Sequence, residues 1–164
     1  MSRFKIKFVA KPDATIPMKA SARASCYDLF AYKFKHSLTD EKEYSIYELQ
    51  PSKSVIVRTG ISVRLPEKFI KDGYEYTFGI EIKSRSGLAF KHSIEAFHGE
   101  IDNDYHKEIM VKLTNNSTQS VFLNRKDRIA QFRIVEIPLM EEEVERTEDL
   151  EGNSDRGGFG STGK

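Results

Sequence analysis

Asp102 and Asp104 lie in a polar segment that is expected to be a hairpin, and Tyr105 follows them directly. A carboxylate in such a segment can activate a water molecule or hold a metal ion, and a tyrosine ring can pack against a sugar. The same residue types also favour turns for local reasons, because Asp and Asn side chains hydrogen-bond to the neighbouring backbone. Taken alone, the segment supports a catalytic and a purely structural interpretation equally.

Arg85, Ser86 and Gly87 carry groups suited to binding phosphate. The arginine supplies a planar cationic fork, the serine a hydroxyl, and the glycine lets the backbone approach a ligand closely. If Ser86 begins a short helix, the free N–H groups of its first turn point toward the same anion. A surface turn without a ligand is the alternative that this segment alone leaves open.

Five of the ten glycines fall within residues 152–163, where they surround Arg156, Phe159, Ser161 and Thr162. So glycine-rich a segment cannot form part of a core, because glycine loses the most backbone freedom on ordering. It can instead close over a ligand, with backbone N–H groups and hydroxyls for phosphate and the Phe159 ring for a flat group. A disordered tail is the alternative.

Strands must position these segments, because apolar and polar residues alternate over much of the chain. The runs with this pattern are 4–8, 61–65, 78–82 and 109–113, and the run 129–137 is apolar enough for a strand buried on both faces or a mixed one. Turn-forming residues separate the runs. Many short strands at this spacing predict an all-β sandwich or barrel, with at most one short helix near 86–91.

The chain divides into three parts by composition. Residues 1–140 form one predicted β domain, residues 141–151 an acidic linker, and residues 152–164 a glycine-rich C-terminal segment. Within the domain, the polar and charged residues 36–44 are expected to form a loop between strands.

Charge and cysteine content narrow the class of protein. The 164 residues have a formal net charge of +1, so no global field favours nucleic acid or a membrane surface. The single cysteine, Cys26, rules out an intramolecular disulfide and fits a reducing compartment. Charged residues interrupt any apolar run near the N-terminus, and no segment is long and apolar enough to cross a bilayer. The sequence thus predicts a soluble intracellular, cytoplasmic protein.

Five segments together resemble the trimeric dUTP nucleotidohydrolases, or dUTPases, in order and spacing. The segments are 24–29, 84–89, 99–105, 127–132 and the tail at 156–163. The resemblance implies a jelly-roll β fold and a homotrimer whose active sites are shared between subunits. It also implies hydrolysis of dUTP to dUMP and pyrophosphate with Mg²⁺, and it admits a nuclear location if the source is eukaryotic or viral.

The resemblance implies roles for the residues that contact the water and the nucleoside. Asp102 matches the carboxylate that activates the attacking water, and Gln131 matches the glutamine that positions this water. Tyr105 matches the ring that packs beneath the deoxyribose and leaves no room for a ribose 2′-hydroxyl. Backbone groups of the same hairpin read the uracil in this family, which here implies Glu100, Ile101 and Met110.

The resemblance also implies which residues hold the triphosphate. Arg85, Ser86 and Gly87 match a phosphate-binding turn that a neighbouring subunit supplies. Asp28 matches an aspartate that holds waters of the Mg²⁺–triphosphate complex, in which the ion keeps much of its water shell.

The glycine-rich segment matches the lid of this family, which closes over the bound nucleotide. Phe159 is expected to stack on the uracil with Gly160 beside it, and Ser161 and Thr162 are expected to bind the γ-phosphate. Arg156 is less well matched, because two residues that usually separate its Arg-Gly pair from the Gly-Phe-Gly are missing here.

Two other functions remain compatible with these motifs. A dCTP deaminase-type enzyme shares the fold and parts of the phosphate site, and a regulatory protein of this fold can bind nucleotide without catalysis. The hairpin at 102–105 and the complete glycine tail favour a dUTPase over the deaminase. The presence of Asp28, Arg85 and Asp102 argues against a non-catalytic homologue.

Overall fold

The computed structural model describes residues 4–144 and residue 146. This part of the chain contains strands joined only in antiparallel pairs and one short helix, α1 (Ser86–His92). The strands are β1 (Lys7–Ala10), β2 (Tyr27–Phe30), β3 (Lys33–Lys35), β4 (Ile46–Leu49), β5 (Ser54–Arg58), β6 (Ile61–Arg64), β7 (Phe69–Lys71), β8 (Tyr74–Lys83), β9 (Ile94–Ala96), β10 (Glu100–Ile101), β11 (Met110–Asn115), β12 (Val121–Asn124) and β13 (Arg128–Pro138).

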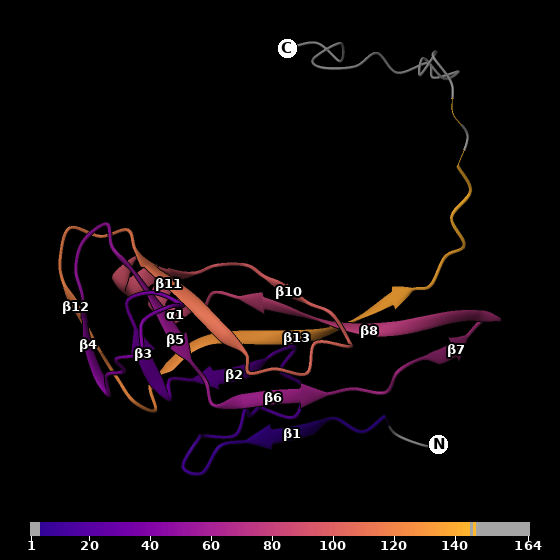
Figure 1. The fold of residues 1–164 in the computed structure, drawn as a ribbon, viewed down its shortest axis with the longest axis horizontal. Helices are drawn as coiled ribbons and strands as arrows, with labels where there is room; N and C mark the ends of the chain where they lie inside the picture. Colours follow the sequence, from indigo (N-terminus) through magenta and orange to yellow (C-terminus); the bar gives the residue numbers. More distant parts are fainter. Residues whose placement is uncertain (1–3, 145, 147–164) are drawn as a thin grey trace.

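Two larger sheets form the body of the molecule (Figure 1). One has the strand order β10-β8-β13-β2, with β7 also paired to β8, and the other has the order β3-β5-β11-β9. Two-stranded sheets, β1-β6 and β12-β4, complete the fold. In Figure 1, α1 lies at the end of the molecule that holds β4 and β12, and β7 lies at the opposite end. The arrangement is a jelly-roll-like β-sandwich, which confirms the predicted fold class.

Alternating apolar side chains build the core between the sheets. Along β5 and β11 every second residue is buried, as the period of a strand requires. The first half of β13 is buried on consecutive positions, including Ile129, Ala130 and Phe132. Each fully buried large side chain contributes about 1.5–3 kcal/mol relative to an exposed one. The strand ends that carry polar residues are therefore held by a rigid frame.

Most predicted elements are confirmed, and one boundary was wrong. The three later alternating runs form β6, β8 and β11, with β11 beginning one residue later at Met110, and the apolar run 129–137 forms β13. Residues 36–44 form a loop, and the predicted helix is α1. The first strand was predicted from Phe4, but β1 begins at Lys7, because only Lys7–Ala10 has a pairing partner in β6. The Phe4 ring packs instead against the rings of Phe69 and Phe78, with centroids 5.1 Å away in each case.

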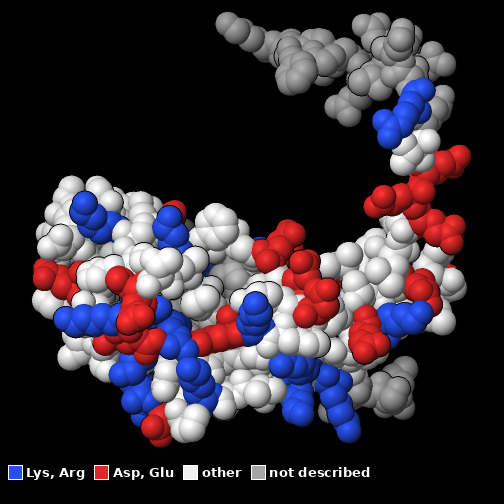
Figure 2. Space-filling view, viewed as in Figure 1, with Lys and Arg blue, Asp and Glu red and all other residues white. Residues whose placement is uncertain are grey.

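Charges of both signs are interspersed over the face shown in Figure 2, in keeping with the small net charge. Acidic side chains follow β13 at Glu141–Glu143, and this exposed segment leads away from the body. The one helix that the structure describes has seven residues and is too short to span a membrane.

Candidate active site

Strand pairing brings together polar residues from three distant parts of the sequence. β13 lies between β2 and β8, so Gln131 stands opposite Asp28 on one side and Lys83 on the other. Ser84 and Arg85 follow β8 directly. The first, second and fourth of the five sequence segments therefore meet at one place.

Asp28 is the central acceptor of this group. It is 9% exposed, and its carboxylate accepts hydrogen bonds from Arg85 Nε at 3.1 Å and from Arg128 Nη1 at 3.4 Å. Arg85 Nη1 also donates to the backbone carbonyl of Arg128 at 3.0 Å, and Gln131 Nε2 donates to the carbonyl of Ser84 at 2.8 Å. One carboxylate thus faces two guanidinium groups. This Asp28 cluster (Asp28, Arg85, Arg128 and Gln131) is suited to an anionic ligand.

Helix α1 begins beside the cluster. Arg85 is its N-cap residue, with an extended backbone, and no side-chain hydrogen bond caps the first turn. Ser86 and Gly87 are exposed, and a Cβ atom on Gly87 would meet nothing within 4 Å. Packing within the chain therefore does not require glycine at this position, whereas close approach of a ligand to the backbone does.

The segment between β10 and β11 holds the remaining predicted residues. Glu100 and Ile101 form β10, and Met110 begins β11. Because β10 ends at Ile101, Asp102 opens a turn, and the Tyr105 N–H closes it by donating to the Asp102 carbonyl at 3.1 Å. Asp102 is exposed and Tyr105 is 39% exposed. The carboxylate and the ring are both accessible to a ligand in this turn at residues 102–109, the nucleoside turn.

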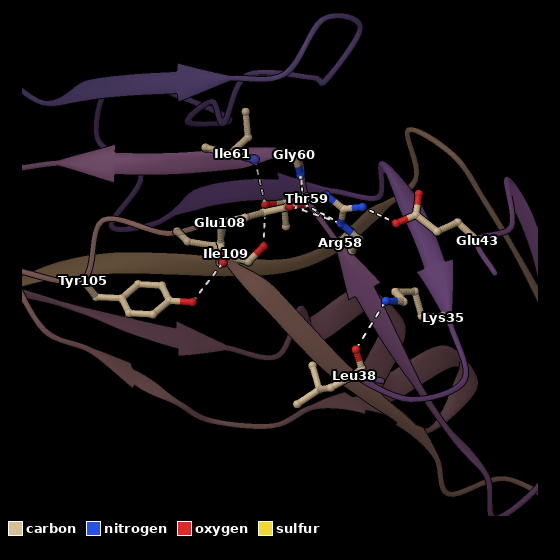
Figure 3. Close-up of polar contacts among 10 residues, drawn as sticks. All are labelled: Lys35, Leu38, Glu43, Arg58, Thr59, Gly60, Ile61, Tyr105, Glu108 and Ile109. Carbon is tan, nitrogen blue, oxygen red and sulfur yellow. Dashed lines mark hydrogen bonds and ion pairs between the residues drawn. The ribbon is translucent and has the colours of Figure 1, made fainter. Parts of the chain in front are cut away.

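Hydrogen bonds hold the nucleoside turn from two sides. Asn103 Nδ2 donates to the Pro66 carbonyl at 2.7 Å and to Thr77 Oγ1 at 2.8 Å. The Tyr105 hydroxyl donates to the backbone carbonyl of Glu108 at 3.2 Å, as Figure 3 shows. The ring is thus fixed by its polar end while its face remains available.

Beneath the turn lies an ion pair that the sequence did not reveal. Arg58 Nε and Nη2 donate to the Glu108 carboxylate at 2.5–3.2 Å, and Gly60 N–H donates to the same carboxylate at 2.7 Å. The other edge of the guanidinium pairs with Glu43, from the 36–44 loop (Figure 3). The hydrogen bonds that Arg58 donates to Glu108, with those to Glu43 adding to them, raise the pKa of Arg58 above its usual value, so Arg58 stays charged. These residues form no motif along the chain. The pairing of β5 with β11 brings Arg58 and Glu108 together, and the pairing of β3 with β5, with the Phe34–Tyr44 bridge, brings Glu43 to them.

The Asp28 cluster and the nucleoside turn do not meet within one chain. Ile101 pairs with Ile80, and Arg85 lies five residues farther along the extended backbone, on the order of 15 Å away at about 3.3 Å per residue. Within residues 4–144, no hydrogen bond joins Asp102 or Tyr105 to the cluster. The predicted lid residues lie outside the described part of the chain: Arg156, Phe159, Gly160, Ser161 and Thr162.

Comparison with known proteins decides the family. A dUTPase family model matches residues 13–163, nearly the whole chain. The chain belongs to the dUTPase family. It is 38% identical over 157 residues to the deoxyuridine 5′-triphosphate nucleotidohydrolase of Hydrogenobaculum sp., with 93% of each chain covered. The mouse enzyme of the same name is 37% identical over 153 residues, which cover 92% of this chain and 80% of the mouse protein.

Solved dUTPase structures share the fold at lower sequence identity. A point mutant of the dUTPase of Staphylococcus bacteriophage 80alpha, bound to dUpNHpp, superposes with a TM-score of 0.69 at 21% identity over the full length of both chains. A point mutant of the dUTPase of phage phi11 of S. aureus, described as coordinating a structural Mg(II) ion, has a TM-score of 0.64 at 19% identity and covers 92% of this chain. The jelly-roll-like sandwich is thus the fold that dUTPases share.

Proposed function

We propose that this member of the dUTPase family hydrolyses dUTP to dUMP and pyrophosphate. One observation carries the proposal: Asp28, Arg85 and Gln131 come from three separate family motifs and converge in space. Arginine groups beside an uncapped helix start provide the charge that a triphosphate requires. The alternatives, a dCTP deaminase-type enzyme and a non-catalytic nucleotide-binding homologue, are less well supported, because the relatives are named as dUTP hydrolases.

In the proposed reaction, water displaces pyrophosphate at the α-phosphorus. The Asp102 carboxylate accepts the proton of the attacking water while the new P–O bond forms and the bond to the β-phosphate oxygen breaks. The Gln131 amide holds this water through its oxygen, because its nitrogen already donates to the Ser84 carbonyl. Arg85, with Ser86 and Gly87 at the start of α1, balances the charge that develops on the phosphates.

The nucleoside turn is proposed to select deoxyuridine. The Tyr105 face packs beneath the deoxyribose and excludes a ribose 2′-hydroxyl, since a ring fixed at its hydroxyl cannot retreat far. Backbone N–H and C=O groups of the turn hydrogen-bond to the edge of the uracil ring. They can recognise it because they present donors and acceptors at fixed positions. The residues that supply this pocket are Glu100, Ile101 and Met110.

Magnesium is proposed to enter with the substrate. Among the described residues, no group of three or more His, Cys, Asp or Glu side chains could hold a metal ion. Asp28 has both oxygens directed at guanidinium groups, and its remaining lone pairs can accept hydrogen bonds from water. This donor set fits an ion that the phosphates carry with its water shell rather than one in a protein cage. When bound, the ion would neutralise charge on the triphosphate.

A homotrimer with shared sites is proposed as the working assembly. Asp102 and Arg85 belong to one reaction but are separated within one chain, so a complete site requires one group from each of two copies. The glycine-rich residues 152–164 are proposed to close the site, with Phe159 over the base and Ser161 and Thr162 on the γ-phosphate. If the lid hypothesis holds, deleting 152–164 lowers kcat and leaves the oligomeric state in sedimentation unchanged.

Pyrophosphate release tests the function directly. The protein is incubated with dUTP, UTP, dTTP and dCTP, each with and without Mg²⁺, and the products are separated. We expect kcat/KM for dUTP to exceed that for UTP and dTTP by a factor of about 100 or more, with Mg²⁺ required for full activity. Ammonia released from dCTP would favour the deaminase, and tight nucleotide binding without turnover would favour the regulatory homologue.

A further inference from the structure

The Glu108 carboxylate accepts several hydrogen bonds beneath the nucleoside turn. It accepts from Arg58 Nε at 3.1 and 3.2 Å, from Arg58 Nη2 at 2.5 Å and from the Gly60 N–H at 2.7 Å. The side chains of Arg58 and Glu108 are 17% and 19% exposed. A charged pair in this setting is screened little by solvent, and its fork geometry fixes direction as well as distance.

Glu108 links this ion pair to the predicted sugar-binding ring. Its own backbone carbonyl accepts the Tyr105 hydroxyl at 3.2 Å. The next residue, Ile109, is fixed by backbone bonds to β6 and by Thr59 Oγ1, which donates to its carbonyl at 2.7 Å. The Glu108 carbonyl shares a planar peptide unit with the Ile109 N–H, which donates to the Ile61 carbonyl at 2.8 Å, so this acceptor is held by β6 on one side and by the Glu108 side chain on the other (Figure 3).

We propose that Arg58 and Glu108 are positioning residues that set the orientation of the Tyr105 ring and so determine how strongly the site rejects ribonucleotides. The inference rests on the proposed function, because it explains selectivity for deoxyuridine in that same site. Neither side chain touches the sugar. Both act through the Glu108 backbone and the Tyr105 hydroxyl.

The geometry predicts which contacts matter. Glu43 pairs with Arg58 through Nη1, on the side of the guanidinium away from Glu108, and makes no hydrogen bond to the nucleoside turn. It is thus a control of the same residue type on the same guanidinium. Glu108→Gln keeps the size of the side chain but removes its charge, and one amide oxygen cannot replace both carboxylate oxygens.

The test compares Glu108→Gln, Arg58→Gln, Arg58→Lys and Glu43→Gln by kcat/KM for dUTP and for UTP. We expect Glu108→Gln and Arg58→Gln to lower the dUTP/UTP ratio by about 5- to 20-fold, chiefly through faster use of UTP, because a charged hydrogen-bonded pair is lost. Arg58→Lys should restore part of the ratio, because lysine keeps the charge but not the fork. Glu43→Gln should leave the ratio within about twofold of wild type.

Two further measurements separate positioning from a loss of fold. Tyr105→Phe keeps the ring and removes only the hydroxyl, and we expect it to lower the dUTP/UTP ratio by about 3- to 10-fold at an unchanged Tm. Hydrogen exchange over residues 102–110 of the free protein should accelerate in Glu108→Gln and not in Glu43→Gln.

The outcomes distinguish the two proposals. A wild-type protein that does not hydrolyse dUTP overturns the proposed function. A wild-type protein that selects dUTP, with Glu108→Gln and Tyr105→Phe both retaining the wild-type ratio, overturns only the positioning role. If Glu108→Gln does not fold, the dUTP/UTP ratio of Tyr105→Phe decides. A wild-type ratio contradicts the positioning role, and a lowered ratio supports it.

Discussion

The Asp28 cluster and the nucleoside turn use charged side chains in opposite ways. In the cluster, Asp28 and Arg85 pair at 3.1 Å at the end of a strand, where the helix start beside them is exposed and uncapped. Beneath the turn, Arg58 and Glu108 pair at 2.5–3.2 Å below the backbone, and the groups left accessible are Asp102 and Tyr105. In the first region Arg128, whose side chain is 52% exposed, and the open helix start are accessible to a ligand, whereas in the second the charged pair holds other groups in place.

This difference has a physical reason. A triphosphate is bound by charge. Its site therefore needs cationic side chains that can exchange an ion pair within the protein for one with the substrate. Uracil and deoxyribose are neutral, and only fixed shape and fixed hydrogen-bonding groups distinguish them from thymine and ribose. The arginines of the cluster should therefore act mainly on affinity, and the turn should determine selectivity and, together with Gln131, catalysis.

The largest effect is expected for Asp102→Asn. The amide cannot accept a proton from the water, so kcat should fall by about 10²- to 10⁴-fold, the usual contribution of a general base. Binding of a non-hydrolysable dUTP analogue should stay within a few-fold of wild type in calorimetry, because the triphosphate contacts lie in the other region. Pyrophosphate release at the wild-type rate would remove Asp102 from the reaction.

Mixing two impaired variants tests whether the two regions act across subunits, in assays at a dUTP concentration well below the wild-type KM, where Arg85→Gln also loses most of its activity. Asp102→Asn and Arg85→Gln chains are unfolded together and refolded as mixed oligomers. If each site takes its turn and its cluster from different copies, random mixing leaves about a quarter of the sites with both regions intact. Activity under these conditions should then rise to about a quarter of wild type, while each variant refolded alone stays at or below about a tenth of wild type. No recovery after mixing, with exchange of chains verified by mass spectrometry, would place both regions in one chain.

The sequence revealed the two regions to different degrees. Asp28, Arg85, Gln131 and Asp102 contact the ligand in the proposed site. Residue types suggested chemistry for the segments of Arg85 and Asp102, whereas the roles of Asp28 and Gln131 came from the resemblance to the family. Their convergence depends on strand order, which alternation alone does not specify, because period-two patterns give faces but not neighbours. The pairing of β13 with both β2 and β8 is visible only in the fold.

The supports of the turn could not be found in this way. Glu43, Arg58 and Glu108 lie far apart in the sequence, and single charged residues such as these are usually solvated surface. Residue 108 acquires its role from the β5–β11 pairing, which places Arg58 opposite Met110. Strand pairing, which the sequence pattern does not show, also decides where the first strand begins. Its apolar pattern starts at Phe4, but its pairing with β6 starts at Lys7.

A smaller effect is expected for Arg85→Gln in isolation. The loss of one charged phosphate contact should raise KM for dUTP by about 10- to 100-fold and affect kcat less. Because this contact does not distinguish sugars, KM for UTP should rise by the same factor and the dUTP/UTP ratio should stay constant. The exposed cation Lys71, in β7 at the other end of the molecule, serves as the control, and Lys71→Gln should change neither constant. A changed dUTP/UTP ratio in Arg85→Gln would contradict the separation of affinity from selectivity.

The smallest effect concerns a more exposed ion pair of the same residue types, whose carboxylate makes no side-chain contact with residues 102–109 in the described part of the chain. Glu81 accepts from Arg133 at 2.7 Å, and this contact, with Lys83 adding to it, lowers the pKa of Glu81 from 4.5 to about 2. A lowered pKa in the folded state stabilises the protein above pH 4.5, and this contribution is lost as the pH falls from 4.5 toward 2.

Since the Arg133 side chain is 47% exposed, Glu81→Gln should lower Tm at pH 7 by only a few degrees. The difference from wild type should narrow as the pH falls below about 4.5. Glu108→Gln, whose pair is less exposed, should lower Tm more at pH 7 and also lower the dUTP/UTP ratio, which Glu81→Gln should leave unchanged. If Glu81→Gln and Glu108→Gln lose equal amounts of Tm and of dUTP/UTP selectivity, the Arg58–Glu108 pair has no role that depends on its place beneath the nucleoside turn.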